Sequence, residues 1–216
     1  LGCGDGRHLT PLLDRSGWVV GIDLSPELLA AARERRPRAA LVRGDMRRLP
    51  LAGGVCGTVV SLFTAFGYFA DDHENERPVA EVARVLRTGG HWCLDVPDAE
   101  RIRAELGDGR ARVREREAGP LAVRESRCWH EATRTVRKHV RIRGRSGAGT
   151  AEAGRAELEY EERVRIYELT ELTELAARHS LARAGGWGGY GGEPLGEGDR
   201  WLLVFRRVAS TGRSAP

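Results

Sequence analysis

Three glycines alternate with other residues at the start of the chain, in the run Leu1-Gly2-Cys3-Gly4-Asp5-Gly6-Arg7. Glycine lets a backbone turn sharply and approach a ligand where any Cβ atom would obstruct it. An acidic residue, Asp23, follows Gly2 by 21 positions and ends the apolar run 18–22. At this spacing an acid at the end of the second strand reaches the ribose hydroxyls of a nucleotide. The two features together predict a site for a nucleotide-type cofactor.

The residues between the glycine run and Asp23 predict the elements that position this site. Leu9, Leu12 and Leu13 recur at the spacing of one helical face, and Gly17 is placed to end that helix. The apolar run 18–22 then predicts a strand. A glycine-rich turn, a helix and a strand that ends in an acid are therefore expected in this order.

Successive stretches of the chain resemble the ordered motifs of class I S-adenosylmethionine-dependent methyltransferases. The stretches are L-G-C-G-D-G-R (1–7), G-I-D-L-S-P-E-L-L (21–29), R-G-D-M-R-R-L-P (43–50), S-L-F-T-A-F-G-Y-F (61–69) and E-V-A-R-V-L-R-T-G-G-H-W-C-L-D (81–95). Several motifs in the right order are far more specific than any one of them. The resemblance implies S-adenosylmethionine as the cofactor.

The matching motif positions give the cofactor contacts that the resemblance implies. Asp45 resembles the family acid that accepts a hydrogen bond from the adenine amino group, with Met46 beside the ring. The alternative for Asp45 is a simple turn residue after Gly44. The full set implied is Gly2, Cys3, Gly4, Gly6, Asp23, Leu24, Asp45, Met46, Leu62 and Phe63.

The chain departs from the family pattern at two places. It begins inside the first motif, so the family's first strand, and the acid usually found two positions before the first glycine, would precede Leu1. The sequence therefore resembles a methyltransferase truncated at its amino terminus, and we expect the 216 residues alone not to form a competent enzyme. Gly57 stands where relatives commonly carry Asp in the fourth strand.

The expected fold class is α/β, with a Rossmann-like, mostly parallel sheet that lacks its first strand and an antiparallel β insertion after the fifth strand. Residues 1–108 are expected to form the cofactor-binding part, 109–166 the insertion, acting as a substrate cover, and 167–208 a helix and two strands that complete the sheet. Residues 209–216 are expected to be a disordered tail.

Local signals predict the remaining helices and strands. One helix is expected to start at Ser25-Pro26-Glu27, to face the sheet with Leu28, Leu29 and Ala32, and to end at Pro37. A second is capped by Asp71 or Asp72, has Val79, Val82 and Leu86 on its apolar face, and ends at Gly89-Gly90. A third is capped by Thr170 and buries Leu172, Leu175 and Ala176. The strand predictions are 39–43, 55–62, 91–96, 182–190 and 200–207. Apolar and charged residues alternate over 136–143 and 157–166, which predicts a hairpin around a mobile loop at 144–150, with glutamates opposite arginines.

Composition restricts the class of protein. No run approaches the roughly 20 apolar residues of a membrane span, so we expect a cytoplasmic protein. The net charge of +4 comes from arginines and the single Lys138, interleaved with 31 acidic residues, so nucleic acid is not an expected partner. The four cysteines are too scattered for a zinc site and are interpreted as reduced, mostly buried residues.

No residue is selected as a general base. The candidates are Tyr68, His73 and Tyr167, followed by His130 and His139, while His8 follows the glycine run and is expected to line the cofactor side. Of the four aromatics in 63–69, Phe63 and Tyr68 are expected in a methyl-transfer pocket, and Phe66 and Phe69 in the core.

The resemblance also bears on the methyl acceptor. Methyltransferases that act on exocyclic amines of nucleic-acid bases usually carry N/D-P-P-Y/F after the fourth strand, where this chain has Ser61-Leu62-Phe63-Thr64. We therefore expect a small organic acceptor, with the acceptor atom undetermined. The alternatives are an NAD(P)-dependent oxidoreductase, which typically has G-x-G-x-x-G, and a non-catalytic binding module of the same fold.

Overall fold

The computed structural model describes residues 1–35, 38–144 and 157–209 and divides into two compact units. The first unit comprises residues 1–66, 70–96 and 169–216, and the second comprises 67–69 and 97–168. Three predictions concern residues outside the described ranges. They are the helix end at Pro37, the loop at 145–150 and the tail after residue 209. The helix that precedes the antiparallel strands belongs to the second unit, whereas the sequence analysis assigned 1–108 to the cofactor-binding part.

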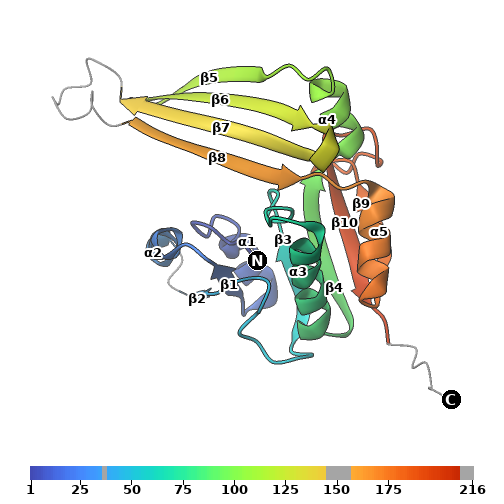
Figure 1. Ribbon diagram of the computed structural model, residues 1–216. Coiled ribbons are helices and arrows are strands. Elements are labelled where there is room, and N and C mark those ends of the chain that lie inside the picture. Colours follow the sequence, from blue (N-terminus) through green and yellow to red (C-terminus); the bar gives the residue numbers. More distant parts are fainter. Residues whose placement is uncertain (36–37, 145–156, 210–216) are drawn as a thin grey trace. The chain divides into compact units, whose positions relative to one another are not determined.

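The first unit contains two sheets. A short parallel pair consists of β1 (Val20–Asp23) and β2 (Ala40–Arg43), and a four-stranded sheet has the order β3-β4-β10-β9 (Figure 1). The strands of the second sheet are β3 (Cys56–Ser61), β4 (Leu86–Pro97), β9 (Leu181–Trp187) and β10 (Arg200–Arg207). Strand β3 is parallel to β4, and β9 is antiparallel to β10. This arrangement confirms the mostly parallel α/β class with an antiparallel pair at its end.

The first three residues contact a strand of each sheet. The amino group of Leu1 donates a 2.7 Å hydrogen bond to the carbonyl of Val60 in β3. The backbone N–H of Cys3 donates to the carbonyl of Ile22 in β1 at 3.1 Å. Hydrogen bonds therefore connect the start of the glycine run to β1 and to β3.

Four helices belong to the first unit: α1 (Leu9–Ser16), α2 (Pro26–Arg35), α3 (Asp72–Val85) and α5 (Leu169–Arg178). Gly17 ends α1 in a left-handed conformation, and Asp71 caps α3, as predicted. Helices α3 and α5 contact each other (Figure 1), and Glu76 of α3 pairs with Arg178 and His179 at the end of α5.

Several local predictions were wrong, each for a structural reason. Leu28 is 44% exposed because α2 buries only the narrow face of Leu29 and Ala32. Leu86 does not extend α3, because its backbone is already extended and it begins β4. Thr170 lies inside the first turn of α5, since that helix starts at Leu169, so it is not the cap.

Aromatic and aliphatic side chains fill the core of the four-stranded sheet. Trp92 is 2% exposed, and its ring lies 6.2 Å from Phe66 in an edge-on contact and 5.6 Å from Phe205. The indole N–H of Trp92 donates to Oγ of Ser61 at 3.1 Å, which satisfies both buried polar groups. Phe66 is therefore a core residue, as expected, while Phe69 of the second unit is only half-buried.

The second unit is one antiparallel sheet of order β5-β6-β7-β8 with a helix before it. Its elements are α4 (Ala99–Leu106), β5 (Arg112–Ala118), β6 (Leu121–His130), a 3-10 turn (Glu131–Thr133), β7 (Thr135–Gly144) and β8 (Glu157–Arg165). Helix α4 was not among the predicted elements, although Asp98 caps it by accepting from two backbone N–H groups.

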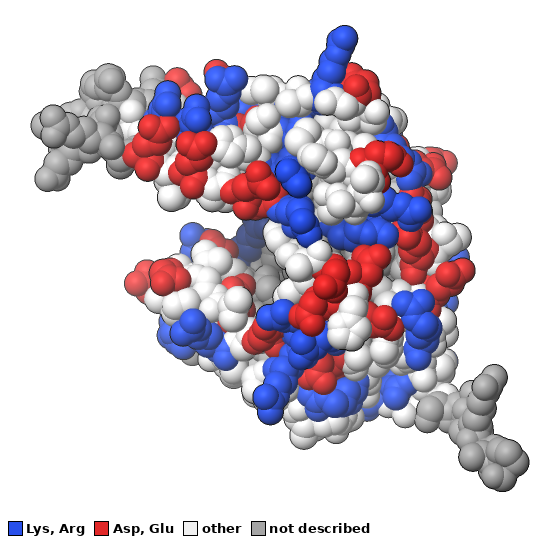
Figure 2. All heavy atoms as spheres, viewed as in Figure 1, with Lys and Arg blue, Asp and Glu red and all other residues white. Residues whose placement is uncertain are grey.

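The β7–β8 pairing confirms the predicted hairpin and its charge pattern. Arg141 is opposite Glu159 and Arg143 is opposite Glu157, with N–O distances of 3.2 and 2.9 Å. Figure 2 shows basic and acidic side chains interleaved over the visible face of the molecule. Val140, on the other face of β7, is 1% exposed.

Candidate functional site

The glycine run forms a compact turn fixed to β1. Gly2, Gly4 and Gly6 all have positive φ angles, of 62°, 51° and 77°. The N–H of Gly6 donates to the carbonyl of Cys3 at 3.0 Å, while Cys3 itself bonds to β1. Gly6 thereby closes the turn just before α1 begins.

Two of these glycines fulfil different requirements. A Cβ atom on Gly2 would lie 2.9 Å from Cβ of Ala65, so Gly2 allows two backbones to approach each other. A Cβ atom on Gly4 would meet nothing within 4 Å. Its positive φ and open surroundings make Gly4 the point at which a ligand can approach the bare backbone.

Asp23 connects the glycine turn to the start of α2. Its Oδ2 accepts the N–H of Gly4 at 2.7 Å, and its Oδ1 accepts the N–H of Ser25 at 3.0 Å. The hydroxyl of Ser25 in turn accepts the N–H of Leu28 at 3.1 Å, which is the predicted helix cap. A carboxylate has about four acceptor positions, so Asp23 keeps further capacity for ligand hydroxyls.

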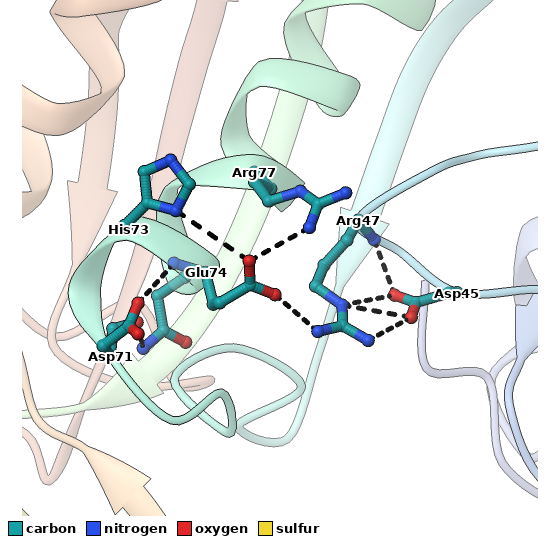
Figure 3. A network of polar contacts seen from close by, with 7 residues as sticks. Asp45, Arg47, Asp71, His73, Glu74 and Arg77 are labelled. Carbon is teal, nitrogen blue, oxygen red and sulfur yellow. Dashed lines mark hydrogen bonds and ion pairs between the residues drawn. The ribbon is translucent and has the colours of Figure 1, made fainter.

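Asp45 lies two residues beyond β2 and is held by Arg47 (Figure 3). Its oxygens accept the backbone N–H of Arg47 at 2.8 Å, Nε at 3.0 and 3.1 Å, and Nη2 at 2.6 Å. These hydrogen bonds lower the pKa of the Asp45 carboxyl below its ordinary value, against a smaller opposing effect of burial. Asp45 is therefore an ionised acceptor at neutral pH.

The other residues implied by the motifs are spread around the glycine turn. Cε of Met46 lies 3.9 Å from the position that a Cβ atom on Gly2 would take. Leu24 is 61% exposed, and its carbonyl accepts Nε of Arg43 at 3.1 Å. Leu62 is half-buried at the end of β3, and the following Phe63 is 46% exposed.

A second cluster, which the sequence analysis did not identify, surrounds Asp95 at the end of β4. Asp95 has no exposed surface. Its Oδ2 accepts the N–H of Phe63 at 2.7 Å and the hydroxyl of Tyr190 at 2.6 Å. Its Oδ1 pairs with Nε of Arg200 at 2.5 Å, and Nη2 of Arg200 donates to Oγ1 of Thr64 at 2.9 Å.

The Phe63 ring is the centre of an aromatic stack. The His8 ring lies 4.9 Å from it and the Tyr190 ring 5.7 Å, both nearly parallel. The guanidinium of Arg7 lies 4.2 Å from the same ring centre. Burial, followed by the charge of Arg7, lowers the pKa of His8 below its ordinary value. The stack therefore joins the end of the glycine turn to the segment after β3 and to the β9–β10 connection.

One signal in the sequence could have indicated Asp95. It is an acid between the apolar residues Leu94 and Val96, and buried charges need partners. Its partners Tyr190 and Arg200 lie about a hundred residues further on, so no local pattern could have identified them.

The candidate general bases lie outside these clusters. His73 is in the first turn of α3, with its side chain 85% exposed. Tyr68, Tyr167, His130 and His139 belong to the second unit. Tyr167 is 7% exposed beneath the guanidinium of Arg165, and His139 bonds to Glu159.

A cavity of about 250 Å³ in the second unit is lined by Arg124, Ser126, His139 and Arg141. Both arginines are paired with glutamates, Arg124 with Glu115 at 3.6 Å and Arg141 with Glu159. The cations that line this cavity are therefore already balanced by acids.

Three general features of the described residues bear on chemistry. Over 1–35, 38–144 and 157–209, no group of three or more His, Cys, Asp or Glu side chains is arranged to hold a metal ion. Within the same ranges no helix has the length and apolar character needed to cross a membrane. The cysteines are all free and only partly buried, rather than mostly buried as expected.

Part of the chain is similar to known methyltransferases. Residues 1–90 match the family described as methyltransferase domain. Over 90 residues the chain is 39% identical to dTDP-3-amino-3,4,6-trideoxy-alpha-D-glucopyranose N,N-dimethyltransferase of Streptomyces venezuelae, covering 42% of this chain and 38% of that protein. It is 42% identical over 90 residues to dTDP-3-amino-3,6-dideoxy-alpha-D-glucopyranose N,N-dimethyltransferase of Streptomyces fradiae, covering 41% and 35%.

The fold is also similar to that of a solved methyltransferase structure. The crystal structure of an S-adenosylmethionine-dependent methyltransferase from Clostridium acetobutylicum superimposes with a TM-score of 0.82 at 14% identity, covering 96% of this chain and 82% of that one. The match over residues 1–90 and the likeness in fold show a methyltransferase-like domain and a methyltransferase-like fold. The matched segment spans little more than a third of the two curated relatives.

Proposed function

We propose that this protein transfers a methyl group from S-adenosylmethionine to a small organic acceptor. One observation carries the proposal: the 2.7 Å hydrogen bond from Gly4 to Asp23 joins the glycine turn to the end of β1. Asp45 follows the end of β2, the parallel neighbour of β1. Ligands of open α/β sheets bind at the carboxyl ends of such strands.

The residues present fit this cofactor. The open backbone at Gly4 gives room for its amino-acid and ribose portion, and Asp23 can accept from the ribose hydroxyls. Asp45 is an ionised acceptor for the adenine amino group, with Met46 beside the glycine turn. When bound, S-adenosylmethionine supplies a methyl group that the positive sulfonium sulfur activates.

The protein's contribution to such a reaction is mainly orientation. Holding two reacting groups in line contributes about 7–11 kcal/mol at best. Phe63 and Tyr190 are 46% and 57% exposed, and the buried Asp95 fixes the backbone N–H of Phe63 and the hydroxyl of Tyr190. We propose these two rings as the acceptor-contacting surface of the first unit.

An amine nitrogen on a sugar is our more specific proposal for the acceptor. It is supported by the two relatives, whose names give N,N-dimethylation of amino sugars. An amine must lose its proton before it attacks a methyl group. Because the Tyr190 hydroxyl proton is donated to Asp95, Tyr190 orients groups rather than accepting that proton.

Binding and transfer can be tested separately. Titration calorimetry should show binding of S-adenosylhomocysteine, and Asp23→Ala should weaken it at least tenfold, because charge-assisted hydrogen bonds contribute about 1.5–3 kcal/mol each. Methyl transfer should then be measured by mass spectrometry with dTDP-linked 3-amino sugars as acceptors.

Each outcome separates the alternatives. Binding of NAD(P) in place of S-adenosylhomocysteine would support the oxidoreductase, and binding without transfer to any amine, hydroxyl or carbon acceptor would support the non-catalytic module. Transfer to a hydroxyl acceptor only would support the proposed methyl transfer but overturn the proposal that the acceptor is an amine.

We also propose that the antiparallel strands of the second unit serve as a substrate cover. All cofactor-site residues named above belong to the first unit. Val140→Asp, which places a charge at a 1% exposed position of β7, should therefore spare cofactor affinity while abolishing transfer. Loss of cofactor binding in a variant whose first unit remains folded would contradict this division.

A further inference from the structure

The carboxylate of Asp45 belongs to a chain of charges that ends on α3. Arg47 contacts Asp45 with its backbone N–H, Nε and Nη2, and its remaining Nη1 donates to Oε2 of Glu74 at 2.5 Å. The other oxygen of Glu74 accepts Nη1 of Arg77 at 3.0 Å. Figure 3 shows these side chains in one continuous row from Asp45 to Arg77.

The anchor of this row is the first turn of α3. Glu74 lies three residues after Asp71, whose carboxylate accepts the Glu74 N–H at 2.8 Å and caps the helix. An acidic side chain in the first helical turn is also favoured by the helix dipole. Glu74 is therefore fixed by its helix, and it holds Arg47 from the side opposite to Asp45.

The Asp45 side chain remains 32% exposed and is therefore accessible to a ligand. Three different donor groups of Arg47 occupy its two oxygens. Because the single Nε proton is shared between both oxygens, three protons engage the carboxylate. A carboxylate offers about four acceptor positions, so roughly one remains. A planar guanidinium that binds in two-pronged fashion also fixes the carboxylate plane, which a flexible ammonium does not.

We propose that Arg47 is a positioning residue that aims the free acceptor position of Asp45 at the adenine amino group, and that Glu74 fixes Arg47 in that orientation. This inference rests on the proposed cofactor. Arg47 itself contacts no part of the cofactor and acts only through Asp45. The alternative is that the Asp45–Arg47–Glu74 row only stabilises the loop after β2.

The test uses a pair of ligands that differ in one group. Affinities of the full chain are measured by calorimetry for S-adenosylhomocysteine and for its purine analogue without the 6-amino group. The wild type should prefer the amino compound by at least about tenfold, the discrimination expected for one charge-assisted hydrogen bond. Arg47→Met should lower the affinity for S-adenosylhomocysteine toward that of the analogue, while affinity for the analogue changes less than about twofold.

Three further variants complete the test. Asp45→Ala should abolish the preference, because it removes the acceptor. Glu74→Gln should reduce the preference partly, and Arg47→Lys should not restore it, because lysine keeps the charge but not the planar contact. Arg77→Met is the matched control, since Arg77 contacts Glu74 but not Asp45. Binding of the analogue also reports that each variant is folded.

The possible results are distinct. Equal losses for both ligands in Arg47→Met, or full restoration by Arg47→Lys, would overturn the positioning role and leave the proposed function intact. No preference in the wild type, although both ligands bind, would overturn the role of Asp45 toward adenine and this inference with it. A wild type that binds neither ligand would overturn the proposed function itself.

Discussion

The hydroxyl of Tyr190 donates a 2.6 Å hydrogen bond to Oδ2 of Asp95, a carboxylate with no exposed surface. The same oxygen accepts the N–H of Phe63, whose φ angle of 54° is rare for a residue with a side chain. Such a conformation costs about 1–3 kcal/mol and persists only where surrounding contacts impose it. The buried carboxylate supplies those contacts and joins the strained turn after β3 to the β9–β10 connection.

The first prediction concerns the stability that Asp95 provides. Asp95→Ala should lower the free energy of unfolding by about 3–5 kcal/mol, because it leaves Arg200 partly buried without its counter-charge. The measurement is urea denaturation followed by tryptophan fluorescence. Asp5→Ala is the control, since the Asp5–Arg35 pair is exposed and should contribute at most about 1 kcal/mol. Similar losses of unfolding free energy in the two variants would refute the stabilising role assigned to Asp95.

The second prediction concerns alkaline pH. Burial, then the hydrogen bond to Asp95 and its negative charge, raise the pKa of the Tyr190 phenol well above its usual range. The folded state therefore holds this proton at a pH where the unfolded chain has lost it. That stabilisation is complete below the unfolded value of about 10 and declines as the pH rises above it.

The direction of this pH dependence can be tested by comparing the stability of the wild type with that of Tyr190→Phe. From pH 9 to about 11 the stability of the wild type should fall more steeply than that of the variant, which has no phenol proton to lose. Tyrosinate absorbance of the two proteins should also coincide up to about pH 10.5, because Tyr190 does not ionise in that range. An absorbance difference near pH 10 would show that the phenol titrates normally.

The third prediction compares two glycines with the same backbone requirement. Gly4 has a φ of 51° and Gly17 a φ of 69°, and a Cβ atom on either would meet nothing within 4 Å. Alanine at either position should therefore cost a similar amount, about 1–2 kcal/mol of stability. Only Gly4→Ala places a methyl group at the proposed cofactor site, so only this variant should bind S-adenosylhomocysteine at least tenfold more weakly. Equal affinities in calorimetry would contradict the placement of the ligand at Gly4.

Elements with complete local signals were predictable from the sequence. Strand β10 spans Arg200–Arg207, as expected, and Ser25 caps α2 because a hydroxyl before Pro26 is a local solution for unpaired N–H groups. The β7–β8 hairpin was predictable from alternation, which has a period of two on both strands. Helix α4 also carries its own signal, the Asp98 cap followed by buried Ile102 and Leu106, and was overlooked.

The parts that could not be predicted depend on distant partners. Strand β4 begins at Leu86 rather than after Gly90, because the chain passes close to β3 there: a Cβ atom on Gly90 would lie 3.0 Å from the carbonyl of Gly57. The motifs assigned Gly4, Asp23 and Asp45 to one candidate site, and a hydrogen bond joins Gly4 to Asp23 in the structure. Their binding of the cofactor stays a prediction. The Asp95–Tyr190–Arg200 cluster required tertiary structure, since its members share no local pattern.

The fourth prediction concerns the charged face of the hairpin. Hydrogen bonds from Arg141, then from His139, lower the pKa of Glu159 below its ordinary value. The corresponding stabilisation is complete above the unfolded value of about 4.3 and is lost as the pH falls through the lower folded value. Wild type should therefore be more stable than Glu159→Gln at pH 7, and the difference should disappear near pH 3 or in high salt, which screens exposed charges.

Glu161→Gln is the matched variant for this prediction. Glu161 lies two residues along the same strand, opposite His139 in the register, and the change removes the same charge. It does not remove the contact with Arg141, because Arg141 pairs with Glu159 and Glu157. If net charge alone stabilised this face, both glutamine variants would show the same pH dependence of unfolding. A steeper acid dependence that only Glu159→Gln abolishes would show that the stabilisation comes from the specific cross-strand pair.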